Sequence, residues 1–312
     1  MGVMTIIPAT PKHLLATQLP LQCSPMKTGH RIHVLFFNHL DAWAVAFMFS
    51  TVALVIHDAL SWQTMVLLTA VALGYWLAFA LNDYYDAPLD RLDDDKRAGN
   101  FFTQGNVTAF SRFRWIAFIL LWLLLLIFAQ FGWRGIGLYA LCLFIMWGYS
   151  APPLRCKQRP LLDLLIHTCF VETFPYLLIL LLIRADWLLL DAVIVSLALL
   201  GSLTAQLGQQ IRDYALDRQF ERNFTIVVGV VWARRLQLGF TAVLILITIL
   251  SLIANIFPLF LLPFGFILLP AIWHRLRPFR QPRRVVAISV VTGLLYTGAM
   301  MLYTAVSPLS FP

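Results

Sequence analysis

The chain has 312 residues, of which 60% are hydrophobic and 12% carry a charge, whereas an ordinary soluble domain is about 25% charged. This composition excludes a soluble globular domain, and an outer-membrane barrel would show short alternating segments instead of long apolar ones. The net charge of +8 requires no nucleic-acid partner, because basic residues also gather on one side of a membrane beside anionic lipid headgroups.

Apolar stretches recur along almost the whole chain. A spanning helix needs about 20 such residues, and helices satisfy their own backbone polar groups in lipid. The sequence therefore predicts an all-α, polytopic membrane protein. The nine predicted spans are 36–56, 62–81, 115–133, 136–150, 161–183, 187–210, 236–257, 259–273 and 285–306.

Basic residues predict the orientation of these spans. All but Arg134 and Arg184 of the 23 lysines and arginines lie in the N-terminal tail or in the loops after even-numbered spans. By the positive-inside rule the N-terminus is cytoplasmic and the C-terminus lies on the opposite side. We expect residues 1–30 to form a cytoplasmic tail, disordered or interfacial, and residues 31–312 to form one transmembrane domain.

Two groups of acidic residues each follow a predicted span on the cytoplasmic side. They lie at about 82–100, in a segment that begins "NDYYDAPLD", and at about 212–224, in a segment that contains "DYALD". A solvated loop or helix cap would explain one such group, but two groups on one side of the membrane favour a shared site. Intervals of four put the polar residues of each group on one helix face: Asn82, Asp86 and Asp90 in the first, Asp213 and Asp217 in the second.

Clustered oxygen ligands of this kind suit Mg²⁺, which usually takes one or two carboxylates together with phosphate oxygens of a substrate. Pro88 complicates the first group, because a proline is expected to kink or end the helix near Ala87. Asp90 would then join Asn82 and Asp86 only if the chain turned back toward them.

The stretch "YSAPPLRCKQRP", residues 149–160, lies between the two acidic groups in sequence. Pro152 and Pro153 hold the backbone extended and present Arg155 and Lys157 on a short, stiff loop. Beside two carboxylate groups, such basic residues suit a clamp on phosphate. Ordinary positive-inside charge explains the loop by itself.

These parts suit a substrate with a diphosphate head and a long apolar tail. Mg²⁺ would neutralise charge as the C–O bond breaks, and the resulting allylic carbocation would need shielding from water and contact with aromatic faces. Tyr85 and Tyr149 flank the motifs and are candidates for that pocket, although interfacial anchoring also explains them.

Two polar residues in or beside the spans are further candidates for an acceptor or cation pocket. Glu172 lies inside the fifth predicted span, where an ionisable group is costly and by default a functional hypothesis. Asn38 lies at the start of the first span. A structural pairing remains open for Glu172, and capping or solvation remains open for Asn38.

The motifs resemble those of the UbiA superfamily of intramembrane prenyltransferases. "NDYYDAPLD" fits the NDxxDxxxD pattern of that family, "DYALD" fits its second DxxxD pattern, and "YSAPPLRCK" resembles its loop after the fourth helix. The resemblance extends over roughly residues 30–306. It implies nine transmembrane helices ringed around a central cavity, with a cytoplasmic cap over two Mg²⁺–diphosphate sites.

The resemblance also implies roles for individual residues. Asp86, Asp213 and Asp217 would be catalytic, and Arg155 and Lys157 would contact the diphosphate. The implied metal set is Asn82, Asp83, Asp86, Asp90, Asp213 and Asp217, in which Asp83 plays a supporting part.

The first motif departs from the family pattern in one respect. Many members carry a basic residue directly after the second aspartate, where this chain has Ala87 and Pro88. Lys96, Arg97 and Arg212 are candidates for the missing diphosphate contact. In motif style the chain looks more like branches that act on lycopene or chlorophyllide than like 4-hydroxybenzoate enzymes.

Three functions fit these features. The leading one is Mg²⁺-dependent transfer of a prenyl group from a prenyl diphosphate to a lipophilic acceptor inside the membrane. A membrane terpene cyclase that acts without an acceptor would share every motif. A transporter or non-catalytic isoprenoid-binding protein fits less well, because transporters place ion sites near the bilayer midplane and these acids lie at helix ends.

Overall fold

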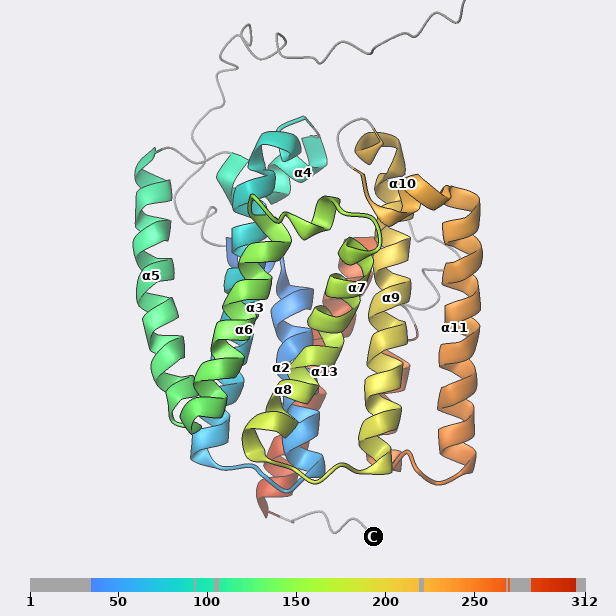
Figure 1. The fold of residues 1–312 in the computed structure, drawn as a ribbon. Helices are drawn as coiled ribbons and strands as arrows, with labels where there is room; N and C mark the ends of the chain where they lie inside the picture. The colour runs from blue at the N-terminus through green and yellow to red at the C-terminus, as the bar shows by residue number, and fades with distance from the viewer. Residues whose placement is uncertain are drawn as a thin grey trace, which may run out of the picture.

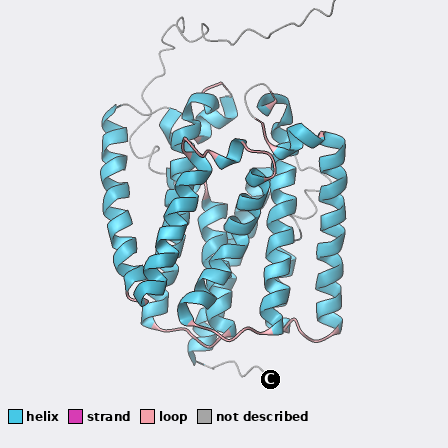
Figure 2. Cartoon of the chain, in the orientation of Figure 1, coloured by secondary structure: helices cyan, strands magenta, loops and turns pink. Residues whose placement is uncertain are grey.

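The computed structural model describes residues 35–92, 94–103, 107–218, 222–267, 269 and 282–306. Every regular element within these ranges is a helix (Figure 2), which confirms the predicted all-α class for this part of the chain. The predicted tail at 1–30 lies outside the described residues.

In the described part of the chain, seven long helices lie with their axes roughly aligned, and helices that follow each other closely in the chain, such as α5 and α6, run in opposite directions (Figure 1). They are α2 (Leu40–Ile56), α3 (Trp62–Asp90), α5 (Val107–Ala129), α6 (Gly132–Ser150), α9 (Leu189–Asp217), α11 (Val230–Ile253) and α13 (Pro282–Val306). A further span is built from α7 (Leu162–Thr168), the π-helical turn η3 (Cys169–Thr173) and α8 (Phe174–Ile183).

Six helices in the described ranges are long and apolar enough to cross a membrane. They are Trp62–Asp90, Phe110–Ala129, Leu162–Ile183, Leu189–Ala215, Val230–Ile253 and Arg284–Val306. Leu40–Ile56 is a shorter apolar helix. The predicted span at 259–273 begins with the 3₁₀ turn η4 (Leu259–Leu261) and lies partly outside the described residues. The count of nine spans therefore stays a prediction.

Helix α3 does not end at Ala87, so the expectation that Pro88 could end the helix there is wrong. The helix continues through Pro88 to Asp90, and the N–H of Arg91 still donates to the carbonyl of Ala87 at 3.3 Å. A proline in the last turn removes only one backbone donor, and a single missing bond is tolerated there. Because the helix continues, Asp90 stays on the face that carries Asn82 and Asp86.

Short elements gather at the end of the bundle where α3 and α9 finish (Figure 1). They are α4 (Asp94–Gly99), the 3₁₀ turns η1 (Phe101–Thr103) and η2 (Cys156–Gln158), and α10 (Phe224–Val228). Both aspartate motifs therefore lie at one end of the molecule.

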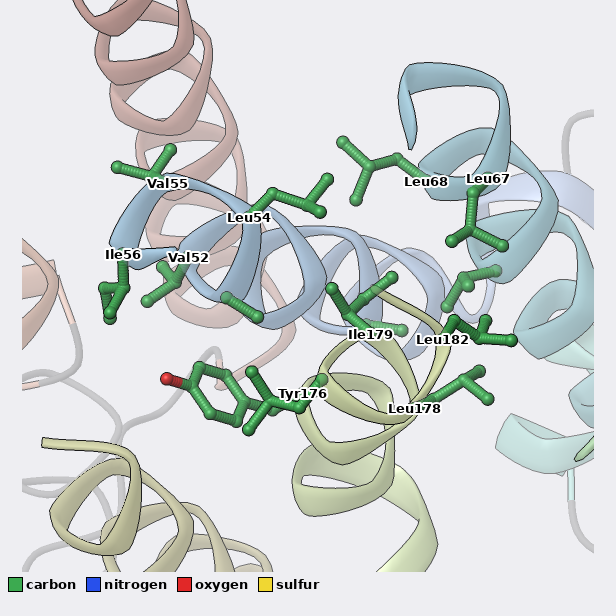
Figure 3. Packing of buried hydrophobic residues seen from close by; sticks show 14 of the residues in the cluster. Val52, Leu54, Val55, Ile56, Leu67, Leu68, Tyr176, Leu178, Ile179 and Leu182 are labelled. Carbon is green, nitrogen blue, oxygen red and sulfur yellow. The ribbon is translucent and has the colours of Figure 1, made fainter. Parts of the chain in front are cut away.

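The largest apolar core lies in the half of the bundle away from these motifs. It joins α2, α3 and α8 through fully buried side chains that include Leu54, Leu67 and Ile179 (Figure 3). A second cluster around Phe102 packs η1 against α3 and α5, and a third around Leu207 joins α7, α9 and α11. These two smaller clusters hold the motif-bearing ends in place.

Helices α5 and α11 form the two edges of the bundle in Figure 1. Both turn large apolar side chains outward, among them Trp115 and Ile253, which are 64% and 73% exposed. In water such surfaces would be covered by a partner, whereas lipid chains solvate them directly. The outward faces of these helices fit a membrane environment.

The packing of α5 against α6 predicts a glycine requirement. A Cβ at Gly135 would stand 1.9 Å from the backbone oxygen of Phe128, so Gly135→Ala should lower the stability by about 1–3 kcal/mol. Gly137→Ala is the matched control, because nothing lies within 4 Å of its added Cβ and alanine favours a helix by about 1 kcal/mol. Melting temperatures of the full chain in detergent should fall for the first variant alone. A melting temperature of Gly135→Ala equal to that of the unmodified chain would contradict this packing.

Candidate active site

The first motif occupies the last turns of α3. Asn82 donates from Nδ2 to Oδ2 of Asp86 at 2.9 Å, as expected for residues four apart on one helix face. The Oδ1 of Asn82 in turn accepts from Oγ of Ser150 at 3.1 Å, at the end of α6. This bond connects the motif to the start of residues 149–160, the stretch with Arg155 and Lys157, which we call the basic loop.

The basic loop contacts the first motif. The ammonium of Lys157, which is buried in η2, donates to Oδ1 of Asn82 at 3.1 Å and also to Oδ1 of Asp86. Nη2 of Arg155 lies 3.8 Å from Oδ1 of Asp86. The Nε of Arg155 is buried and finds no hydrogen-bond acceptor among the described residues, so an incoming phosphate oxygen would satisfy it.

Asp83 is a neighbour of Asp86 on α3 but meets a different partner. Its Oδ2 is 2.8 Å from Nε2 of His39, which precedes α2. Burial by itself would lower the pKa of His39, but the hydrogen bond and the charge of Asp83 outweigh burial and raise it. From the sequence, His39 was a candidate beside Asn38 for the lining of an acceptor site, with capping or solvation as the alternative. No spacing in the sequence connects it to position 83.

The second motif occupies the last turn of α9 and meets a residue from the first loop. Nζ of Lys96, on α4, lies 3.2 Å from Oδ2 of Asp213 and 4.0 Å from Oδ1 of Asp217. Burial would lower the pKa of Lys96, but the charges of Asp213, Asp217 and Asp90 raise it. Lys96, which follows the first motif in the chain, therefore pairs with the carboxylates of the second motif.

Two asparagines that the sequence reasoning missed hold the last aspartate of each motif. Asn100 donates from Nδ2 to Oδ2 of Asp90 at 2.7 Å, and Asn223 donates from Nδ2 to Oδ2 of Asp217 at 3.0 Å. The signal available in the sequence was the repeated pair Asn–Phe, which follows both motifs.

Each motif offers Mg²⁺ a pair of side chains with oxygen ligands. Within the described ranges no group of three His, Cys, Asp or Glu side chains is arranged to hold a metal ion without other ligands. Each motif instead offers two neighbouring oxygen-bearing side chains, Asn82 with Asp86 and Asp213 with Asp217. This suits an ion that takes one or two carboxylates and completes its shell with water and substrate phosphate.

The end of the bundle where α3 and α9 finish, with both motifs and the basic loop, is called the mouth below. The other predicted basic and aromatic residues lie on the elements that surround it. Arg97 is half-buried on α4, and Arg212 is exposed on α9. Tyr85 and Arg155 line a cavity of about 280 Å³ between the end of α3 and the basic loop, together with Pro88, Leu89, Leu92 and Gln158. Tyr149 is half-buried at the end of α6.

The two remaining candidates lie apart from each other. Asn38 lies beside α4, where its Oδ1 would stand 3.2 Å from a Cβ at Gly99. Glu172 lies in the π-helical turn η3 and packs against α9, where its Oε2 would stand 2.9 Å from a Cβ at Gly201. Gly201 precedes Asp213 by twelve residues, which is about 18 Å along a helix. Glu172 is therefore deep in the bundle and not at the mouth.

The His39–Asp83 pair predicts a pH-dependent stability. Since the folded-state pKa of His39 is raised, its contribution is complete below the unfolded pKa of about 6.5 and is lost as the pH rises through the folded value. We expect the melting temperature of the chain to exceed that of His39→Gln by more at about pH 5.5 than at about pH 9. The measurement is made in EDTA, so that metal binding does not contribute. A difference that grows with pH would contradict the pairing.

The fold is similar to solved structures of UbiA homologues. The apo homolog from Aeropyrum pernix K1 is 15% identical, with a TM-score of 0.64, and the match covers 85% of this chain and 98% of that one. A homolog from Archaeoglobus fulgidus bound to GPP and Mg²⁺ is 19% identical, with a TM-score of 0.60 and coverage of 86% and 99%. One bound to DMAPP and Mg²⁺ is 18% identical, with a TM-score of 0.55 and coverage of 85% and 86%.

At these identities the likeness shows the fold alone, and no curated protein matches the chain. The sequence itself matches the UbiA prenyltransferase family over residues 42–296, a range that contains both aspartate motifs and the basic loop. The resemblance drawn from the motifs is thereby confirmed. Together with the apolar helices, it makes the chain an integral membrane protein. The chain belongs to the UbiA prenyltransferase family.

Proposed function

We propose that this protein transfers a prenyl group from a prenyl diphosphate to a lipophilic acceptor within the membrane, in a reaction that requires Mg²⁺. The observation that carries the proposal is Lys96, which lies within 4.0 Å of both aspartates of the second motif although it belongs to the loop after the first. Both motifs therefore border one mouth. Solved structures of homologs with GPP or DMAPP and Mg²⁺ support this class of substrate.

The metal ligands in this proposal are the side chains implied by the motifs. Asn82, Asp86 and Asp90 of α3 and Asp213 and Asp217 of α9 would hold two Mg²⁺ ions, and Asp83, also on α3, would support the first set. When bound, Mg²⁺ supplies positive charge that offsets the charge developing on the leaving diphosphate.

Residues of the chain itself perform the other tasks. Arg155 and Lys157 bind diphosphate oxygens from the loop after α6, and the buried Nε of Arg155 gains the acceptor that it lacks among the described residues. Lys96, which pairs with Asp213, would also contact the diphosphate, and Arg97 on α4 and Arg212 on α9 are further candidates for that contact. The short elements α4 and α10 act as a cap that excludes water from the ionising bond.

The apolar interior below the mouth takes the prenyl chain, and the mouth faces the cytoplasm. This orientation is inferred from the sequence, in which all the basic residues except Arg134 and Arg184 belong to the tail or to loops after even-numbered predicted spans, as both motifs do. Tyr85, Tyr149, Asn38 and Glu172 remain candidates for contacts with the acceptor or with the cation.

Loss of a metal ligand should abolish turnover and leave the fold intact. We expect Asp86→Ala and Asp213→Ala each to lower kcat/KM by at least about a hundredfold, because metal catalysis contributes several kcal/mol and each 1.36 kcal/mol is tenfold. EDTA should have the same effect on the unmodified chain. Asp186→Ala is the control, because this exposed acid lies in the loop between α8 and α9. Full activity of either motif variant would remove that residue from the site.

The product distinguishes transfer from cyclisation. We expect purified protein given geranylgeranyl diphosphate and Mg²⁺ to release diphosphate efficiently only when a membrane lipid extract supplies an acceptor. The products are identified by mass spectrometry. A cyclic hydrocarbon as the main product without extract would replace transfer by cyclisation, and isoprenoid movement across vesicles without diphosphate release would favour a transporter.

A further inference from the structure

We propose that Asn100 and Asn223 are a matched pair of positioning residues. Each would hold one oxygen of the last aspartate in its motif and leave the other oxygen for metal or diphosphate. The inference rests on the proposed function, and it assigns residues that lie outside both motifs.

Asn100 is held in one orientation by three hydrogen bonds. Its side chain is buried, with a residue exposure of 2%. Nδ2 donates to Oδ2 of Asp90 at 2.7 Å and to the backbone oxygen of Asp83 at 2.8 Å, while Oδ1 accepts from the N–H of Phe102 at 2.8 Å. Since both amide hydrogens and the amide oxygen are engaged, the side chain has no alternative partner to turn toward. The carboxylate of Asp90 is fixed to the end of α3 as a result.

Asn223 makes the equivalent contacts in the second half of the chain. Its residue exposure is 4%. Nδ2 donates to Oδ2 of Asp217 at 3.0 Å, and Oδ1 accepts from the N–H of Ile226 at 3.0 Å, which makes Asn223 the N-cap of α10. The other oxygen of Asp217, Oδ1, is the one that lies 4.0 Å from Lys96.

A buried network keeps Asn223 in place behind the motif. Oδ2 of Asp163, on α7, accepts from the N–H of Phe224 at 3.0 Å and from Nε2 of Gln210 at 2.6 Å. Oε1 of Gln210 accepts from the N–H and the hydroxyl of Thr225 at 3.1 and 2.9 Å. The start of α10 is therefore fixed to α7 and α9, and the asparagine with it.

The two arrangements share the same parts. In both, an Asn–Phe pair follows the motif, the amide N–H groups meet Oδ2 of the last aspartate, and the amide oxygen accepts a backbone N–H two or three residues later. Hydrogen bonds to the unligated oxygen of a metal-binding carboxylate orient it, and losing such a partner typically costs about 10–100-fold in metal affinity or activity. The repetition on two unrelated stretches indicates a common task at both motifs.

A helix-capping role alone would produce part of this geometry, so the test has to separate capping from positioning. Serine caps helices about as well as asparagine, but its side chain is shorter and ends in a hydroxyl that does not extend to the carboxylate. Asn223→Ser and Asn100→Ser therefore keep the local turn and lose the bond to the aspartate. Alanine at the same positions loses both the bond that holds the local turn and the bond to the aspartate.

The experiment measures binding, independently of turnover. Labelled geranylgeranyl diphosphate is bound to the full chain in detergent while Mg²⁺ is titrated, and melting temperatures are recorded alongside. We expect the half-saturating Mg²⁺ concentration to rise by about 10–100-fold in both serine variants. Asn100→Ser also loses the bond to the backbone oxygen of Asp83, so its melting temperature should fall, but no further than that of Gln237→Ala. Gln237→Ala is the control, because Gln237 is a buried amide that bonds Thr204 and Arg234 away from the motifs. It should lower the melting temperature and leave the Mg²⁺ dependence unchanged.

The outcomes are distinguishable. If the unmodified chain binds the diphosphate without any dependence on Mg²⁺, the proposed function fails, and the positioning role fails with it. If the unmodified chain needs Mg²⁺ but the serine variants have the same half-saturating concentration, only the positioning role is overturned. Alanine variants that weaken binding, with serine variants that restore it, would reduce both asparagines to caps and would also overturn the inference.

Discussion

Negative charge at the end of an apolar helix bundle has to be balanced, and this requirement organises the whole site. Carboxylates withdrawn from water without partners are costly. Each motif aspartate accordingly meets a donor from another segment: Asp83 meets His39, Asp86 meets Lys157, Asp90 meets Asn100, Asp213 meets Lys96, and Asp217 meets Asn223. The long helices supply the acids, and the short segments between them supply the donors.

The polar site depends on apolar packing close to it. Phe102 is fully buried in the cluster that joins η1 to α3 and α5, and it directly follows the segment that carries Lys96 and Asn100. Leu207 has the corresponding role for the second motif: it is buried in the cluster that packs α9 against α7 and α11. Because these clusters anchor the segments on both sides of the mouth, the donors are placed before any ligand arrives. Preorganisation of this kind is what a site for a highly charged headgroup requires.

Depth separates the charged end of the bundle from Glu172. Glu172 lies about 18 Å below the second motif by helical rise, on a π-helical turn between α7 and α8. Such turns are rare in proteins, and those that occur are often found at functional sites. A headgroup bound at the mouth would leave Glu172 beside the apolar chain of the substrate or beside an acceptor, and not beside the breaking bond. The deep half of the bundle is otherwise filled by the core of α2, α3 and α8.

Much of this protein was readable from its sequence. The apolar runs predicted an all-helical membrane protein, and the spacing of Asn82, Asp86 and Asp90 predicted a shared helix face, because both properties depend on residues close together in the chain. The motifs and the basic loop also indicated the family. Local spacing misjudged the helix end at Pro88, where only one backbone bond is lost.

The partners of the aspartates were decided by tertiary structure alone. His39 lies 44 residues from Asp83, and Lys157 lies 71 residues from Asp86. No periodicity connects positions so far apart, and Lys96 could be assigned to the second motif only once the structure showed its ammonium beside Asp213. The sequence by itself determined which groups are charged and which helix face they share. Packing determined which opposite charge each one meets, because that depends on how the helix ends come together in space.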